Sequence, residues 1–352
     1  MIKVKKRKNS IFLNSEKVLL LFILIYAVLS TWAAYDHEIL HRVNFLLYLS
    51  LTTKKLIIVV YLFIIFFCFK ILWWKITIHP QPLFRDWWPM ITQDFLTKEN
   101  LLRATLGFLI LFSFMSLYTS MKGMISYYGE YTWDPVLSEI DRRIHFGIDP
   151  WRIIQPWLGQ PNITRAVSFI YTEMWGVTSL SIITWQLFSI KNPHLRTQFF
   201  LTFILIWSVN GTLLAILFAS GGPCFYEFMT GSSYYATQMN YLNTVNNQYG
   251  LLSVDIQNTL LSIYQVDRIT SAGGISAMPS MHISQAFLLF LFGSCLHKWM
   301  GRILGLFFLM IFIGSIHLGW HYAIDGYCSI IMTWILWKLS GVIIKKLDSP
   351  SL

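Results

Sequence analysis

The sequence predicts an all-α integral membrane protein that crosses the bilayer several times. Of its 352 residues, 55% are hydrophobic and only 12% are charged. That charged fraction is about half of the roughly 25% usual in soluble domains. The apolar residues also gather in long runs, and a helix needs about 20 apolar residues to cross the hydrocarbon layer. A soluble fold could not bury this much apolar surface.

Eight apolar runs are candidates for membrane-spanning helices. They lie at roughly residues 17–35, 56–74, 103–121, 166–189, 198–219, 283–298, 302–319 and 321–343. The sixth and seventh runs are short, but the basic turn from Lys298 to Arg302 separates them as a tight surface loop would. The first run also has the features of a signal peptide, although Thr31-Trp32-Ala33 is a poor cleavage site. We expect a membrane span there.

The chain divides into two parts at a segment with the composition of an interfacial linker. Residues 75–102 contain several prolines and the pair Trp87-Trp88, and tryptophan favours the headgroup zone. We therefore predict a two-span N-terminal region with this linker, residues 1–102, and a six-span core, residues 103–346.

The placement of lysine and arginine predicts the orientation, because short cytoplasmic loops are enriched in these residues. Basic residues crowd the N-terminus and recur in alternate loops and at the C-terminal tail. The long loop 220–281 holds only Arg268. We expect both termini in the cytoplasm and this loop on the periplasmic or lumenal face.

Composition and residue spacing disfavour two other classes: nucleic-acid-binding proteins, and proteins stabilised by zinc or disulfides. The net charge is +10, but the basic residues flank apolar runs instead of forming a stripe with aromatic residues, so no nucleic-acid partner is expected. The four cysteines show no C-x-x-C spacing, so neither a zinc ribbon nor a disulfide framework is indicated.

A cluster of ionisable residues lies in the C-terminal part of the chain. Such groups at membrane depth are costly and usually functional. His321 and Asp325 are four residues apart, so on a helix the carboxylate shares a face with the imidazole and can fix which ring nitrogen is free. The stretch between His282 and His321 has room for one short span and a second that returns. We expect both histidines at the same membrane face.

The residues just before the sixth run favour an anion site. Pro279 and Ser280 precede the expected helix N-terminus, where backbone N–H groups are exposed. The Ser280 hydroxyl adds a donor. With one histidine oriented by a carboxylate and another able to protonate a leaving oxygen, this arrangement favours phosphoryl transfer.

Two short motifs resemble signatures of the type 2 phosphatidic acid phosphatase superfamily. Ser280-Met281-His282 matches its second signature, Ser-x-His. Gly319-Trp320-His321-Tyr322, followed by Asp325, matches its third. The resemblance extends loosely over the six-span part, including the segment from Trp133 to Gly147. It is strongest for the branch that contains the inositol phosphorylceramide synthases.

The resemblance implies a six-helix transmembrane bundle of the phosphatidic acid phosphatase/haloperoxidase type, here with two additional N-terminal helices. It implies that His321 is the nucleophile that forms a phosphohistidine, that Asp325 orients it, and that His282 is the acid for the leaving group. No metal or organic cofactor is required. The partners would be a lipid phosphate or phospholipid substrate and an alcohol such as ceramide as acceptor.

The chain departs from the family pattern where the phosphate charge is neutralised. Gly314 and Ser315 stand where many members have Ser-Arg, and the basic first signature is not recognisable. Arg268, in the same outer loop as Ser280, and His317, one turn before His321, are our candidates for substrate binding in addition to Ser280.

Several alternatives stay open at this point. With water as acceptor the same site is a lipid phosphatase, and with an alcohol it is a transferase. A transporter or scaffold that inherited the bundle would tolerate the loss of His321. A membrane metalloprotein could use the ladder of His317, His321 and Asp325, but di-iron membrane enzymes need more histidines, including adjacent pairs, and no His-His occurs here.

Overall fold

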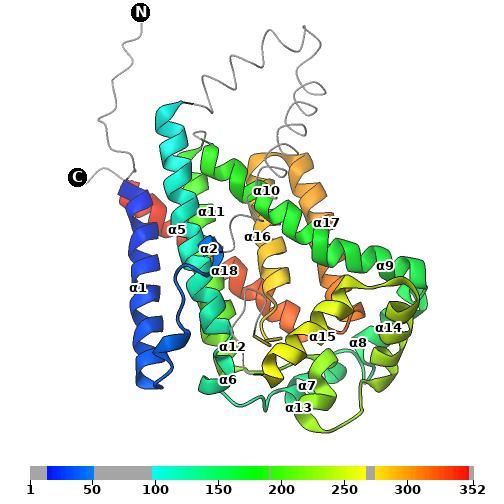
Figure 1. Ribbon diagram of the computed structural model, residues 1–352. Helices are drawn as coiled ribbons and strands as arrows, with labels where there is room; N and C mark the ends of the chain where they lie inside the picture. The colour runs from blue at the N-terminus through cyan, green and yellow to red at the C-terminus, as the bar shows by residue number, and fades with distance from the viewer. Residues whose placement is uncertain (1–13, 51–96, 190–191, 267–273, 349–352) are drawn as a thin grey trace, which may run out of the picture.

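The computed structural model describes residues 14–50, 97–189, 192–266 and 274–348 (Figure 1). Within these ranges every regular element is a helix. Six helical stretches are long and apolar enough to cross a membrane: Lys17–Asp36, Lys98–Lys122, Pro161–Phe188, Pro193–Leu217, Lys298–His317 and Ala323–Leu347. The prediction of an all-α, multi-span membrane protein is thereby confirmed.

Two of the eight predicted spans need comment. The sixth corresponds to α16 (Met281–Leu296), whose 16 residues fall short of the other spans. A helix of that length extends about 24 Å, against a hydrocarbon core of about 30 Å. The second, 56–74, lies outside the described residues. The described chain therefore contains the first of the two predicted N-terminal spans, α1 (Asn14–Asp36). That these spans are additional to the bundle, and that the chain divides at residue 102, stay predictions.

The helices of the remaining long stretches form the body of the bundle (Figure 1). They are α5 (Lys98–Lys122), α9 (Pro161–Phe169), α10 (Trp175–Phe188), α11 (Pro193–Leu205), α12 (Ala215–Leu217), α17 (Lys298–His317) and α18 (Ala323–Asp348). Two spans contain a π-helical segment, Ile170–Met174 between α9 and α10 and Ile206–Leu214 between α11 and α12. Such segments occur often at functional sites.

Shorter helices gather at one end of the bundle, where the candidate site lies (Figure 1). They are α6 (Ile125–Tyr128), α7 (Asp134–Ile144), α8 (Pro150–Leu158), α13 (Tyr226–Thr230), α14 (Ala236–Tyr249) and α15 (Leu252–Gln265), with a 3₁₀ turn at Pro223–Phe225. A 3₁₀ turn at Leu40–Arg42 and α2 (Leu47–Ser50) follow α1. The predicted long loop 220–281 is thus largely helical in its described part. Its helices are too polar to be recognised as spans from hydropathy.

Local sequence explains where several helices begin. Proline stands in the first turn of α7, α8, α9 and α11, where its missing N–H is not needed. Thr97 caps α5, because its hydroxyl accepts a hydrogen bond from the Asn100 N–H at 3.2 Å. Ser280 caps α16 in the same way through the Ile283 N–H at 3.4 Å. These residues fix the ends of the helices that carry the site.

The stretch Pro193–Leu217 lies at the centre of the bundle. Its apolar window is 67% buried inside the protein, more than any other candidate span, whereas that of Lys17–Asp36 is 17% buried. The outer helix α1 packs on α11 and α5. The hydroxyls of Tyr26 and Thr212, 2.8 Å apart, join α1 to the central span. A buried polar pair of this kind fixes the register of α1 against the core.

Candidate active site

The structure places His321 and Asp325 in direct contact. The Nδ1 atom of His321 lies 3.3 Å from Asp325 Oδ2, and both side chains are buried. The same carboxylate oxygen accepts the backbone N–H of Tyr322 at 3.0 Å. Asp325 lies in the first turn of α18, and His321 precedes this helix. The predicted i, i+4 relation between imidazole and carboxylate is therefore present.

The turn that carries His321 connects α17 to α18. Gly319 has a φ of +71°, a left-handed conformation that glycine adopts without strain. The backbone N–H groups of Trp320 and His321 both donate to the Ser315 carbonyl, at 3.0 and 3.3 Å. The imidazole is thus held at a helix end by the backbone on one side and by a carboxylate on the other.

The second histidine, His282, stands in the first turn of α16 between two aromatic rings. Its ring stacks on Tyr171 with centroids 4.4 Å apart, and the Trp175 ring lies 4.1 Å away. The indole N–H of Trp175 donates to the His282 carbonyl at 3.1 Å. Tyr171 belongs to the π-helical segment and also stacks on Trp320, beside the nucleophile candidate. The aromatic rings thereby fix the imidazole plane.

The two histidines are linked through Tyr171, whose ring stacks on His282 and on Trp320, the residue before His321. Lys122 is the last residue of α5. Its backbone carbonyl is so close to Gly274 that a Cβ added to that glycine would lie 2.4 Å from the oxygen. The segment that leads to Ser280 therefore packs directly on the end of α5.

The other predicted binding residues occupy different places. Ser280 is fully buried, and its carbonyl accepts the Ser329 hydroxyl at 3.0 Å, which ties α16 to α18. His317 is buried, and its Nε2 atom lies 2.9 Å from the Thr164 hydroxyl. The Nδ1 atom of His317 is buried without a partner among the described residues. Arg268 lies outside the described residues. Contacts of these side chains with substrate stay predictions.

A buried carboxylate on α7 forms hydrogen bonds with residues that surround His321. Asp134 accepts the backbone N–H groups of Gly221 and Gly222, both at 2.8 Å, and the Tyr322 hydroxyl, also at 2.8 Å. Burial raises the pKa of this carboxyl above its usual value, and the three hydrogen bonds oppose the rise. Gly222 passes so close to the turn that carries His321 that a Cβ there would lie 2.5 Å from the Trp320 carbonyl oxygen.

A second carboxylate on α7 holds the start of α18. Asp141 accepts the backbone N–H groups of Ala323 and Ile324 at 3.0 and 2.9 Å, which satisfies free donors of the first turn. Burial raises the pKa of Asp141 to about 6. His145, one turn later, lies 3.0 Å from the Tyr327 hydroxyl through its Nε2 atom. Helix α7 therefore fixes both the loop facing His321 and the helix carrying Asp325.

Sequence reasoning missed the supporting residues of the site. Asp134 and Asp141 lie seven residues apart in the segment from Trp133 to Gly147, whose resemblance to the family was noted without roles. Their spacing puts both carboxylates on the same face of a helix, which is a detectable signal. Tyr171 and Trp175 carried no such signal, because they are two aromatic residues among many in an apolar run.

The metalloprotein alternative has no geometric support in the described chain. No group of three or more His, Cys, Asp or Glu side chains there could hold a metal ion. His317 points to Thr164, whereas His321 points to Asp325. The ladder seen in the sequence therefore does not converge on one point.

Comparison with known proteins agrees with the geometry of the site. The family model described as PAP2 superfamily matches residues 135–339, which is more than half of the chain and includes His282, His321 and Asp325. Searches of curated proteins and of solved structures gave no significant match. The superfamily generally comprises phosphatases and phosphotransferases that act on lipid-like substrates. This chain is a multi-span membrane protein that belongs to the PAP2 superfamily.

Proposed function

We propose that the protein transfers a phosphoryl group or a phospho-headgroup from a membrane lipid through a phosphohistidine on His321. The observation that supports this most is the contact between His321 Nδ1 and Asp325 Oδ2. A carboxylate that accepts the Nδ1 proton leaves the Nε2 lone pair free to attack. The pair is buried, so water does not compete for the carboxylate.

In the first step, Nε2 of His321 attacks phosphorus and the bond from phosphorus to the lipid oxygen breaks. His282 supplies the proton that the leaving oxygen needs. In the second step an acceptor hydroxyl gives its proton to His282 and attacks the phosphohistidine, and the N–P bond breaks. The aromatic rings of Tyr171 and Trp175 support this role because they hold the His282 imidazole in one plane.

Charge neutralisation at the phosphate is assigned to Lys122 and to the N-terminus of α16. Lys122 ends α5, and its backbone packs against Gly274 in the segment that leads to Ser280. The positive end of the α16 dipole, beside Ser280, adds attraction for an anion. Arg268 and His317 remain candidates for further contacts. This assignment replaces the basic signature that the sequence lacks.

We further propose that the acceptor is an alcohol, as in the inositol phosphorylceramide synthase branch that the sequence resembles. The chain segments α13, α14 and α15 pack over the end of the bundle where His321 lies. Gln257 on α15 donates to the Leu318 carbonyl at 2.9 Å and Gln238 on α14 donates to the Ile316 carbonyl at 2.8 Å, so this cover is attached to the catalytic turn. Such a cover would favour an organic acceptor over bulk water.

Product analysis tests both the phosphohistidine mechanism and the identity of the acceptor. Purified protein is given a panel of phospholipids with and without ceramide, and phosphate release and new headgroup-bearing lipids are measured together. We expect a new lipid product that depends on the acceptor and that His321→Ala abolishes. Release of free phosphate that does not depend on ceramide would contradict the transferase proposal and indicate a phosphatase.

The control is His194→Ala, which removes an exposed histidine in the first turn of α11, away from the site. This variant should keep wild-type activity. Equal activity of wild type and His321→Ala, with both proteins folded, would contradict the phosphohistidine mechanism and favour a transporter or scaffold.

A further inference from the structure

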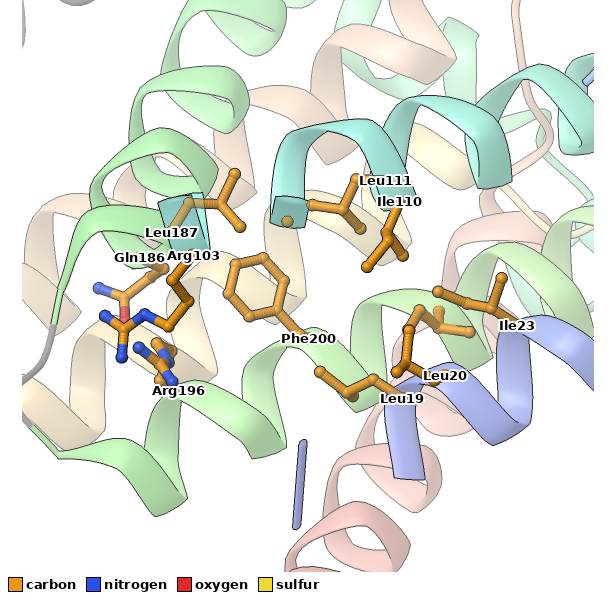
Figure 2. A pocket seen from close by; sticks show the side chains of 12 residues that line it. Leu19, Leu20, Ile23, Arg103, Ile110, Leu111, Gln186, Leu187, Arg196 and Phe200 are labelled. Atoms are coloured by element: carbon orange, nitrogen blue, oxygen red, sulfur yellow. The ribbon is translucent and has the colours of Figure 1, made fainter. Parts of the chain in front are cut away.

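A second pocket lies at the end of the bundle opposite the candidate active site. It is lined by residues of α1, α5, α10 and α11 (Figure 2). Along α10, Gln186 at this pocket is about 17 Å from Trp175 beside His282, at 1.5 Å per residue. The pocket is therefore separate from the catalytic residues and serves no step proposed above.

One end of this pocket is polar and strongly basic. The side chains of Arg103, Gln186 and Arg196 lie together there (Figure 2). A terminal nitrogen of Arg103 donates to the Ser189 carbonyl at 3.0 Å, and one of Arg196 donates to the same oxygen at 2.6 Å. Two guanidinium groups are thus held beside one carbonyl at the end of α10. Arg196 is only 4% exposed, so the site is part of the folded interior.

The basic end holds a nitrogen atom that no described residue uses. The Nε atom of Arg103 is buried and has no hydrogen-bond partner in the part of the chain that the structure describes. Guanidinium groups are suited to phosphate because their N–H groups form paired hydrogen bonds with its oxygens. The basic end therefore fits a phosphate group.

The rest of the pocket is apolar and open to the side. Its walls include Leu19, Leu20, Ile23, Ile110, Leu111 and Phe200 (Figure 2). Leu20 is 38% exposed on the outer surface of α1, so the pocket has a mouth on the membrane-facing side. The volume of the pocket is about 70 Å³, which admits a small group and not a whole lipid. Apolar chains would have to lie along the mouth, against α1 and α5.

We propose that this pocket binds the phosphate headgroup of an anionic phospholipid from the leaflet at this end of the bundle. The two arginines bind phosphate oxygens, and the acyl chains lie along the apolar walls formed by α1 and α5. Basic pockets between transmembrane helices are typical binding places for anionic headgroups. A bound lipid would join the weakly buried helix α1 to the central span.

Lipid-dependent thermal unfolding tests this proposal. Protein purified in a neutral detergent is titrated with phosphatidylglycerol, phosphatidylcholine or inorganic phosphate. We expect phosphatidylglycerol alone to raise Tm, by about 3–6 °C at saturation. In Arg103→Gln the concentration for half of this rise should increase at least about tenfold, because charge-assisted hydrogen bonds to the phosphate are lost.

The matched control is Arg302→Gln, which removes an exposed arginine in the first turns of α17 outside the pocket. It should respond to phosphatidylglycerol like the wild type, and so should His321→Ala, which separates this site from catalysis. An equal effect of phosphatidylcholine, an equal effect of inorganic phosphate, or equal responses of Arg103→Gln and Arg302→Gln would each overturn the proposal.

A second variant covers the case in which Arg103→Gln does not fold. Ile110→Trp keeps both arginines and fills the apolar part of the pocket. It should weaken the response to phosphatidylglycerol to a similar degree. A full response in this variant would show that the lipid binds elsewhere.

Discussion

The hydroxyl of Tyr322 donates a hydrogen bond of 2.8 Å to the buried carboxylate of Asp134, which lies 188 residues earlier in the chain. Tyr322 follows the proposed nucleophile His321, and Asp134 begins helix α7. The same carboxylate binds the Gly221 and Gly222 N–H groups. The Asp134 side chain therefore sets the distance between the turn that carries His321 and the loop that contains Gly221 and Gly222.

Replacing Asp134 by asparagine should destabilise the protein by about 3 kcal/mol, because one amide oxygen cannot accept from three buried donors. Thermal unfolding in detergent measures this effect. Glu139→Gln on the same helix is the control. The Glu139 side chain is 38% exposed and pairs with Arg142 and Arg143, and exposed ion pairs contribute little to stability. Equal effects of the two substitutions would contradict the proposed role of Asp134.

The substitution Tyr322→Phe removes only the hydroxyl. It should separate the effect on the position of His321 from the effect on folding. The loss of one hydrogen bond costs about 1 kcal/mol of stability. We expect kcat to fall while KM changes little, because the variant misplaces His321 without removing a substrate contact. Steady-state kinetics on a lipid substrate measures both constants. A rise in KM at constant kcat would instead place Tyr322 in substrate binding.

Asp141 should make stability depend on pH in the mildly acidic range. Burial raises its pKa from 3.8 to about 6, so between these values the folded state binds more protons than the unfolded state. Stability should therefore fall as pH rises from about 4 to about 6, by on the order of 2–3 kcal/mol. Asp141→Asn should remove this slope. The charges of His145 and Asp325 also influence the pKa of the Asp141 carboxyl. His145→Gln is the control, because it removes one of these neighbours and keeps the carboxyl. An unchanged slope in Asp141→Asn would contradict the assignment.

Asp325→Asn should lower kcat by about 10³- to 10⁴-fold, because an amide can stabilise the wrong tautomer of His321. The substitution keeps the shape of the side chain, so the amount of folded protein in the membrane should change little. Rates of lipid turnover per folded molecule give the measurement. A decrease of less than about tenfold would show that Asp325 does not orient the nucleophile.

His282→Ala should be far more harmful with a poor leaving group than with a good one. A general acid contributes about 10²- to 10⁴-fold when the leaving oxygen must be protonated. A lipid alcohol needs that proton, whereas p-nitrophenolate leaves without it. Comparing the two substrates in wild type and variant tests this role. Equal losses for both would mean that His282 binds phosphate and does not act as an acid.

Much of the bundle could be predicted because each membrane span corresponds to a continuous apolar run in the sequence. The six long spans all coincide with predicted ones, and α16 was placed correctly although it is short. The helices α14 and α15 were not predicted. Their surfaces are mostly polar, so hydropathy alone does not separate them from a loop.

The motif that contains His321 and Asp325 could be located in the sequence because its residues are close in the chain. The four-residue spacing led us to expect their contact, although His321 lies in the turn before α18 and not on the helix itself. Asp134 reaches the surroundings of His321 from α7, 188 residues earlier in the chain, a separation that no local pattern encodes. The role of His317 also depends on a distant residue, Thr164.

The most direct test of the central claim is trapping of the covalent intermediate. Protein is mixed with ³²P-labelled lipid phosphate, quenched in alkali, digested and analysed by mass spectrometry. We predict phosphate on His321, stable in base and labile in acid, and its absence from His321→Ala. Turnover by the wild type with no label on His321 at any quench time, or label retained in His321→Ala, would contradict the proposed mechanism.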